Sequence, residues 1–194
     1  MDRDEVRARL YAACPPDIGK KPAEEAAVLR RGRPAGVLVG LLAGSDGPRV
    51  ILTERNAQLK AHPAEISLPG GGMEPGDDGP AATALRETYE EIGLPPEKVE
   101  LLGCLPVYET VSGYCVYPIV GWIEPPVEYA LQANEVADVF EVPLSFVLDP
   151  GNRSRENVIY EGQNHCYYVL PYPGHRIWGA TAGILVSLAR ALGS

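Results

Sequence analysis

The sequence predicts an α/β protein whose mixed sheet is covered by helices on both faces. Three observations support this fold class. Apolar, β-branched runs alternate with amphipathic segments along the chain, as in domains that pack helices on a sheet. Proline- and glycine-containing turns separate these segments at short intervals. The length of 194 residues and the hydrophobic fraction of 45% fit a single domain, 1–194, with a substantial core.

The first half of the chain gives the elements in a simple order. A helix over 4–13 ends at Cys14-Pro15-Pro16 and, with the polar loop that follows, forms an N-terminal extension over 1–34. Apolar runs at 35–44 and 49–55 are separated by a turn around Gly47 and form a strand pair. Residues 64–72 are expected to form a short strand that runs into three glycines.

The second half continues this pattern. Strand-like runs over 99–109 and 114–124 are joined through a turn at Gly113. Residues 137–150 are typical of a strand followed by a short helix that stops at Pro150. A hairpin is predicted over 157–172, turning at 161–164, and an amphipathic helix over 177–192 closes the chain.

Charge and cysteine content disfavour several classes of function. The net charge of −9 argues against nucleic acid or an anionic membrane as a partner. No run approaches the roughly 18 apolar residues of a membrane span, and the N-terminus lacks an apolar signal core. The four cysteines show neither a C-x-x-C pair nor zinc spacing, and Cys104 and Cys115 lie in apolar runs. We therefore expect a reduced, cytoplasmic protein with a small-molecule substrate; the sequence assigns no oligomeric state.

A helix is predicted directly after the glycine-rich stretch, between residues 79 and 93. Asp77 or Asp78 is expected to cap it, Pro80 suits its first turn, and Gly93 ends it. At 100° per residue, four side chains fall within a narrow arc that faces the core. This stripe is expected to consist of Ala81, Leu85, Thr88 and Ile92.

The same helix carries a cluster of acidic residues. Glu87, Glu90 and Glu91 stand at positions i, i+3 and i+4, and therefore share one face. Like charges at such spacing cost about 0.2–0.5 kcal/mol per pair, and Arg86 relieves only part of this cost. The cluster is either a solvated helix face or a site for a hard cation, Mg²⁺ or Mn²⁺. The preceding glycines favour the second interpretation, because they let the backbone approach a ligand or a metal closely.

These residues resemble the Nudix box, G-x5-E-x7-R-E-U-x-E-E-x-G-U, where U is a bulky apolar residue. Two positions depart from the pattern: Asp78 replaces the first glutamate, and Thr88 replaces an apolar residue. The resemblance implies a Nudix-type α/β/α sandwich with a mixed sheet and a loop-helix-loop catalytic motif at 72–94. The residues that match in register are Gly72, Arg86, Glu87, Glu90, Glu91, Gly93 and Leu94.

The resemblance also implies roles for individual residues. The metal ligands would be Glu87, Glu90 and Glu91, with a backbone carbonyl near Gly71 completing the shell around Mg²⁺ or Mn²⁺. Arg86 would orient the glutamates by ion pairing. The catalytic base would be Glu91 in the first place, and Glu135 in a later loop in the second. The alternative for Glu135 is an ordinary exposed acid.

A second motif lies directly upstream of the box. "ILTERNAQLKAHPAEISLPGG" is similar to the motif of the coenzyme A pyrophosphatase branch, L-L-T-x-R-S-x-x-L-x-x-H-x-G-x-x-x-F-P-G-G. Its matches are Leu52, Thr53, Arg55, Leu59, His62, Pro69, Gly70 and Gly71, and its departures are Ile51, Asn56, Ala64 and Leu68. The substrate-binding residues expected from this stretch and the box are Arg55, Lys60, His62, Gly70, Gly71 and Gly72. Alternatively, Arg55 pairs with a neighbouring glutamate, and His62 caps or packs.

Together, the two motifs imply metal-dependent hydrolysis of the diphosphate of coenzyme A or its derivatives. The products would be 3′,5′-ADP and 4′-phosphopantetheine or its acylated form. The first alternative is a Nudix pyrophosphatase for ADP-ribose, nucleotide sugars or dinucleoside polyphosphates. A remote alternative is a module that senses a nucleotide without turnover, although such modules commonly lack glutamates of the box, and this chain keeps all three.

Overall fold

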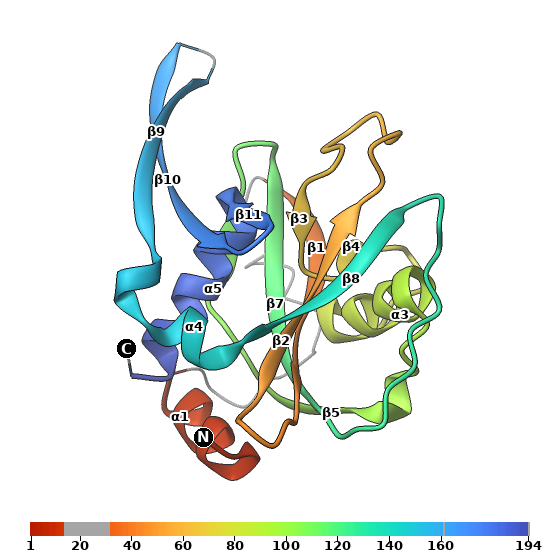
Figure 1. The fold of residues 1–194 in the computed structure, drawn as a ribbon. Coiled ribbons are helices and arrows are strands. Elements are labelled where there is room, and N and C mark those ends of the chain that lie inside the picture. The colour runs from red at the N-terminus through yellow and green to blue at the C-terminus, as the bar shows by residue number, and fades with distance from the viewer. Residues whose placement is uncertain (14–31, 161, 194) are drawn as a thin grey trace.

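A computed structural model describes residues 1–13, 32–160 and 162–193 of the chain (Figure 1). The end of the first helix at Cys14, most of the predicted N-terminal loop, and Glu161 of the predicted hairpin turn lie outside the described residues. In chain order the elements are α1 (Arg3–Ala13), β1 (Arg33–Leu42), β2 (Arg49–Arg55), β3 (Ile66–Ser67), β4 (Gly70–Gly72), α3 (Pro80–Ile92), η1 (Pro96–Lys98), β5 (Val99–Cys104), β6 (Tyr108–Glu109), β7 (Tyr114–Ile123), β8 (Val136–Pro143), α4 (Leu144–Leu148), η2 (Pro150–Asn152), β9 (Ser154–Tyr160), β10 (Gln163–Tyr172), β11 (His175–Trp178) and α5 (Gly179–Ala191).

The main sheet is mixed, as predicted, and its strands run in the order β3-β2-β1-β7-β5. The central pair, β1 and β7, is parallel along its whole length, from Arg33 opposite Tyr114 to Leu42 opposite Ile123. The other pairings in this sheet are antiparallel. Strand β2 pairs with β1, β3 and β8, and β4 pairs with β1. Strands β5 and β6 both pair with β7. The strand pair predicted from the first two apolar runs is therefore confirmed.

Helices cover both faces of this sheet, because its central strands are apolar on both sides. In β1, Val39 and Leu41 point into one core, which they share with α1, α4 and α5. Leu38 and Leu42 alternate with them and point into a second core, which α3 covers. Figure 1 shows α3 on one side of the sheet and α4 and α5 on the other. None of the described helices combines the length and the apolar character that crossing a bilayer requires.

Two segments and one cysteine differ from the sequence-based expectation. The hairpin of β9 and β10 extends into a separate sheet with β11, so the closing helix begins at Gly179 rather than at Ile177. The strand expected over 99–109 is split into β5 and β6, because Pro106 has no N–H with which to continue the ladder. Cys115 is buried as expected, whereas Cys104 is partly exposed.

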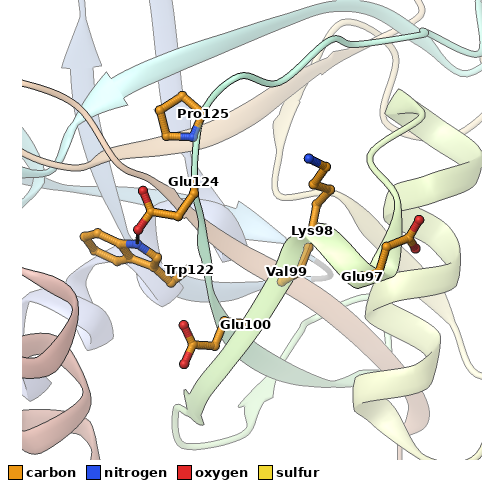
Figure 2. A pocket seen from close by; sticks show the side chains of 7 residues that line it. All are labelled: Glu97, Lys98, Val99, Glu100, Trp122, Glu124 and Pro125. Carbon is orange, nitrogen blue, oxygen red and sulfur yellow. Dashed lines mark hydrogen bonds between the residues drawn. The ribbon is translucent and has the colours of Figure 1, made fainter.

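A cavity of about 290 Å³ lies beside β5 and the end of β7 (Figure 2). Its lining residues are Glu97, Lys98, Val99, Glu100, Trp122, Glu124 and Pro125. The indole Nε1–H of Trp122 donates to Glu124 at 2.7 Å, and Glu100 pairs with arginines of α1. Three carboxylates against one lysine make this lining unfavourable for a diphosphate. The cavity shares no residue with the acidic cluster of α3.

Candidate active site

The acidic helix α3 lies close against the first strand of the sheet. A Cβ atom added at Gly36 of β1 would lie 2.2 Å from the carbonyl oxygen of Pro80, so only glycine permits this approach. Of the predicted core-facing stripe only Leu85 is not fully buried, and the buried face is wider than predicted because it also includes Ala84 and Thr83. Thr88 is buried as expected, and its hydroxyl donates to the carbonyl of Ala84 at 2.6 Å.

The C-terminal end of α3 agrees with the sequence-based prediction, and its N-terminal end does not. Gly93 ends the helix in the left-handed conformation, with φ of 70°, and its N–H donates to the Tyr89 carbonyl, as expected. At the other end the predicted aspartate cap is wrong. The N-cap residue is Gly79, with φ of 96° and no side-chain capping bond. Asp77 does not cap α3, because its carboxylate is used by Arg86 and Thr83.

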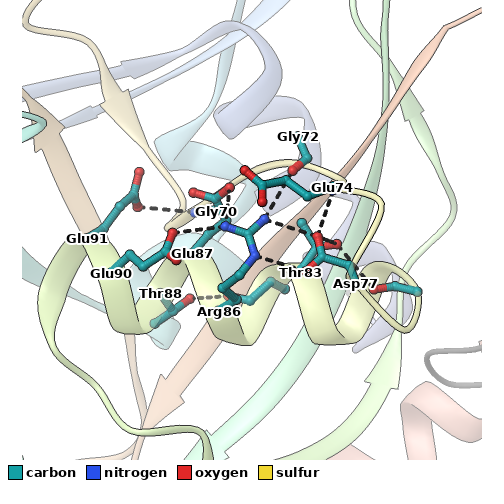
Figure 3. A network of polar contacts seen from close by, with 12 residues as sticks. Gly70, Gly72, Glu74, Asp77, Thr83, Arg86, Glu87, Thr88, Glu90 and Glu91 are labelled. Atoms are coloured by element: carbon teal, nitrogen blue, oxygen red, sulfur yellow. Dashed lines mark hydrogen bonds and ion pairs between the residues drawn. The ribbon is translucent and has the colours of Figure 1, made fainter.

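Asp77 holds Arg86 through two parallel hydrogen bonds (Figure 3). The Nε and Nη2 atoms of Arg86 donate to the two carboxylate oxygens at 2.9 and 3.0 Å. This pairing holds the pKa of Asp77 well below its usual range, and the bonds from the Glu74 N–H and the Thr83 hydroxyl contribute in the same direction. Asp78, which aligns with the acidic position of the box, is exposed. The carboxylate that fixes the arginine is therefore that of Asp77.

Arg86 in turn reaches the glutamates that follow it on the helix. Its Nη1 atom lies 3.0 Å from an oxygen of Glu87 and 2.9 Å from an oxygen of Glu90. Its Nη2 atom also donates to the carbonyl of Gly72 at 3.3 Å. Figure 3 shows the guanidinium between the glycine loop and the acidic face of α3. The arginine thus links the loop to the helix and offsets part of the repulsion among the acids.

Gly71 leaves the space in which the Glu87 carboxylate lies. A Cβ atom at this position would approach the carboxylate carbon and one oxygen of Glu87 to 2.6 Å, which is closer than real contacts allow. Burial raises the pKa of Glu87, and Arg86 acts in the opposite direction. The backbone of β4 therefore lies directly against one acid of the cluster.

Glu91 is not on a solvated face of α3, because its exposed fraction is only 3%. One of its oxygens accepts a hydrogen bond from the Gly70 N–H at 3.2 Å. Burial raises the pKa of Glu91 to about 7, the charges of Glu87 and Glu135 add to this, and the Gly70 N–H and Arg55 oppose it. The three glutamates thus differ in environment: Glu91 is buried, Glu87 is half-buried and Glu90 is exposed.

We expect Glu91→Gln to stabilise the metal-free protein at pH 8. The pKa of Glu91 rises from 4.5 to about 7 on folding. The native state therefore keeps a proton that the unfolded chain loses between these values, and the free energy of unfolding falls as the pH rises. Glutamine removes this penalty. We therefore expect the free energy of unfolding of the variant to exceed that of wild type by about 1–3 kcal/mol at pH 8, and the difference to be almost zero below pH 4.5.

Urea unfolding in a chelator at pH 4.5, 6 and 8 measures this effect. Glu90→Gln is the matched control, because it makes the same substitution on an exposed residue one position earlier. An equal difference between Glu91→Gln and wild type at pH 4.5 and 8 would contradict the buried-carboxylate interpretation.

Arg55 and Glu135 lie beside this helix although both are distant from it in sequence. The charges of both residues act on the pKa of Glu91. The Nε–H of Arg55 is buried and has no hydrogen-bond partner in the described part of the chain. Glu135 is exposed on the loop between β7 and β8. The structure therefore brings Arg55 and Glu135 close to the box glutamates, and the buried Nε–H of Arg55 has no partner among the described residues.

The remaining basic residues of the upstream motif are at the surface. Lys60 and His62 are exposed, and Nδ1 of His62 lies 2.9 Å from a carboxylate oxygen of Glu65. His62 has φ of 54° and Ala64 has φ of 55°, in the region that favours glycine. The family motif has glycine at position 64, so its residue fits this backbone better than the alanine of this chain. The sequence offers capping or packing as the alternative role of His62, and the structure instead pairs its imidazole with Glu65.

The acidic cluster suits a divalent cation by its chemistry. Among residues 1–13, 32–160 and 162–193, no three His, Cys, Asp or Glu side chains converge on one point as metal ligands. Arg86 lies between Glu87 and Glu90 instead. Three carboxylates next to a glycine backbone are nevertheless the donors that Mg²⁺ and Mn²⁺ prefer. The buried Glu91, with its raised pKa, is also a group whose charge a nearby cation would stabilise.

Comparison with known proteins agrees with this geometry. The NUDIX domain family matches residues 32–161. This chain is a member of the Nudix family. The Nudix hydrolase NudL of Citrobacter koseri, described as uncharacterized, is 38% identical over 161 residues, which are 83% of each chain. NudL of Escherichia coli K12, described in the same way, is 37% identical with the same coverage.

Solved Nudix structures share the fold. The NUDIX domain of Shewanella oneidensis NrtR, complexed with ADP ribose, matches with a TM-score of 0.52 and 18% identity, covering 98% of this chain and 97% of that one. RenU, a Nudix hydrolase from M. smegmatis, matches with a TM-score of 0.51 and 22% identity, covering 63% and 78%. The family match and the NudL relatives identify this Nudix protein as a pyrophosphatase, and Nudix hydrolases generally use divalent metal ions.

Sequence reasoning missed two contributors to the Nudix site. The sequence pattern indicates only a helix cap for Asp77, although its carboxylate fixes Arg86. Asn56 is only a departure from the upstream motif in the sequence, yet its side chain binds the loop that carries Glu135. The spacing of acids around the box offers a weak signal for Asp77. No local pattern indicates the role of Asn56, because its partner is 77 residues away.

Proposed function

We propose that this Nudix enzyme hydrolyses the diphosphate linkage of coenzyme A or its derivatives. The products are 3′,5′-ADP and 4′-phosphopantetheine, or acyl-phosphopantetheine from a thioester. The observation that carries the proposal is the upstream motif from Leu52 to Gly71, supported by its Arg55, whose buried Nε–H has no hydrogen-bond partner among the described residues. A guanidinium in such a position suits a phosphate, since it binds oxygens through two parallel N–H groups.

The residues of the cluster have different roles in the proposed reaction. Glu87, Glu90 and Glu91 hold Mg²⁺ or Mn²⁺ together with the backbone near Gly71. When bound, the cations supply charge neutralisation on the diphosphate and lower the pKa of a coordinated water. Arg86, fixed by Asp77, orients the glutamates. Gly70, Gly71 and Gly72 are proposed to lie beside the substrate: Gly71 lies against the Glu87 carboxylate, and the space beside Gly72 is open.

Two carboxylates are candidates for the proton acceptor. Glu91 is the first, because it lies beside the proposed metal shell and the Gly70 N–H donates a hydrogen bond to its carboxylate. Glu135 is the second, because it lies on a loop beside the same helix and is exposed to solvent. Lys60 and His62, at the surface of the preceding loop, are proposed to meet the phosphates that extend beyond Arg55.

A substrate panel tests the proposal directly. The purified protein is incubated with Mg²⁺ or Mn²⁺ and with coenzyme A, an acyl-coenzyme A, ADP-ribose and a dinucleoside polyphosphate, and products are separated by chromatography. The expected result is a higher kcat/KM on the coenzyme A compounds than on the others. Preference for ADP-ribose or a dinucleoside polyphosphate would support the alternative pyrophosphatase, and binding without cleavage of any compound would support a sensing module.

We expect Arg55→Ala to reduce kcat/KM on coenzyme A more than on dephospho-coenzyme A, which lacks the 3′-phosphate. A charge-assisted contact to phosphate contributes about 1.5–3 kcal/mol, so the ratio of the two kcat/KM values should fall about tenfold or more. Because Arg55 also acts on Glu91, both substrates should lose some turnover. The ratio isolates recognition of the 3′-phosphate from that shared effect.

Arg49→Ala is the matched control for this measurement. Arg49 lies at the opposite end of β2, where it pairs with Glu141. Its loss should leave the ratio unchanged. If the ratio of kcat/KM on coenzyme A to that on dephospho-coenzyme A is unchanged in Arg55→Ala as well, Arg55 does not bind the 3′-phosphate.

A further inference from the structure

The loop that carries Glu135 is anchored first on the metal-binding helix. The N–H of Ala130 donates to the carbonyl of Ile92 at 2.8 Å, and the N–H of Gln132 donates to the carbonyl of Glu91 at 2.9 Å. These carbonyls belong to the last turn of α3, where no further helical N–H groups are available to them. The loop from residue 130 to 136 therefore starts from the same helical turn that carries two of the box glutamates.

Asn56 provides the second anchor of this loop. Its Nδ2 atom donates to the carbonyl of Ala133 at 2.7 Å, and its backbone N–H donates to the carbonyl of Glu135 at 2.8 Å. Its Oδ1 atom accepts the N–H of Gln58 at 2.8 Å, which fixes the side chain in a turn. Asn56 directly follows Arg55, so one short segment carries both the proposed phosphate-binding residue and the anchor of the Glu135 loop.

The two anchors place the charge of Glu135 near the acidic cluster. Burial raises the pKa of Glu87 and of Glu91, and the charge of Glu135 adds to the effect on both. Glu135 itself is exposed, so no surrounding core fixes its position. Its distance from the reacting groups therefore depends on the hydrogen bonds that hold the loop backbone.

We propose that Asn56 is a positioning residue, whose side-chain amide holds the 130–136 loop so that Glu135 stays beside the metal-binding glutamates during hydrolysis. Its contribution to turnover rests on the proposed function, whereas its hold on the loop does not. The family motif has serine at this position, and a serine side chain is too short to bond both Gln58 and Ala133. The hydrogen bond from the Asn56 side chain to Ala133 is therefore not expected from the family motif.

Asn56→Asp tests the role, because aspartate has the same shape and keeps the acceptor for Gln58 but lacks the donor to Ala133. In the metal-free protein, amide hydrogen exchange of residues 130–136 should become about fivefold faster, which corresponds to the loss of about one hydrogen bond. With substrate and metal, kcat should fall about tenfold while KM stays within about twofold, as expected when a group that acts in the transition state is displaced.

Two further variants separate charge from positioning. Asn157→Asp adds the same charge on the exposed strand β9 and should change neither exchange in the loop nor kcat. Asn56→Ser removes the donor to Ala133 without adding charge, and its effects should match those of Asn56→Asp. An unchanged exchange rate in both Asn56 variants overturns the positioning role whatever the activity.

A double-mutant cycle with Glu135→Gln decides whether Asn56 acts through Glu135. If it does, adding Asn56→Ser to Glu135→Gln lowers kcat no further. Losses that multiply overturn the proposal. If wild type cleaves no diphosphate of the panel, the proposed function fails, and the exchange measurement still decides whether Asn56 holds the loop.

Discussion

Glu90→Gln should reduce kcat of the Nudix enzyme at least about 10²-fold, the usual effect of removing an electrostatic contact used in catalysis. The substitution keeps the size of the side chain and removes one anionic oxygen from the proposed metal shell. Because Glu90 is exposed, its loss should leave the fold intact. Steady-state turnover with saturating Mg²⁺ or Mn²⁺ measures the loss of activity. Thermal unfolding of the metal-free protein tests whether the fold is intact.

Glu97→Gln is the matched control for Glu90→Gln. Glu97 is an exposed acid in η1, just beyond the end of α3, and its loss changes the net charge by the same amount. It should retain turnover close to wild type. Turnover near wild type in Glu90→Gln would instead remove Glu90 from the metal site and leave a solvated helix face as its interpretation.

Asp77→Ala should lower the free energy of unfolding by about 2–4 kcal/mol, since it removes one partner from a buried, bidentate ion pair. The guanidinium of Arg86 would keep its contacts to Glu87 and Glu90 but lose both bonds to Asp77. Turnover should fall as well, because an arginine without this anchor no longer fixes the glutamates. Urea unfolding at pH 7 measures the first effect.

The pH dependence of this loss provides a second check. The pKa of Asp77 is lowered from 3.8 on folding, so the carboxylate binds its proton more weakly in the native state. Its contribution is fully present above about pH 4 and disappears as the pH falls further. The difference between wild type and Asp77→Ala should therefore shrink below pH 4.

Asp78→Ala is the control that distinguishes the carboxylate paired with Arg86 in the structure, Asp77, from the one that occupies the acidic position of the motif, Asp78. Asp78 occupies the acidic position of the Nudix box but is exposed, so its loss should change the unfolding free energy by less than about 0.5 kcal/mol. A larger loss in Asp78→Ala than in Asp77→Ala would mean that the box position, and not the observed ion pair, anchors Arg86.

Much of the fold could be predicted from local patterns in the sequence. Alternating apolar runs gave the strand pair β1 and β2, and helical spacing gave α3, with its end at Gly93. The prediction failed in two places for different reasons. Pro106 splits one expected strand through a local effect, its missing N–H, whereas β11 forms up to Trp178 because it pairs with β10, a neighbour in space.

The sequence by itself determined the family and the position of the acidic cluster, because one helical turn fixes where Glu87, Glu90 and Glu91 stand relative to each other. Only the tertiary structure decided how these acids differ. Packing against the sheet buries Glu91, the loop before α3 brings Asp77 to Arg86, and Asn56 reaches a loop 77 residues away. Burial, ion pairing and loop attachment depend on segments that meet in space, and spacing along one helix does not encode them.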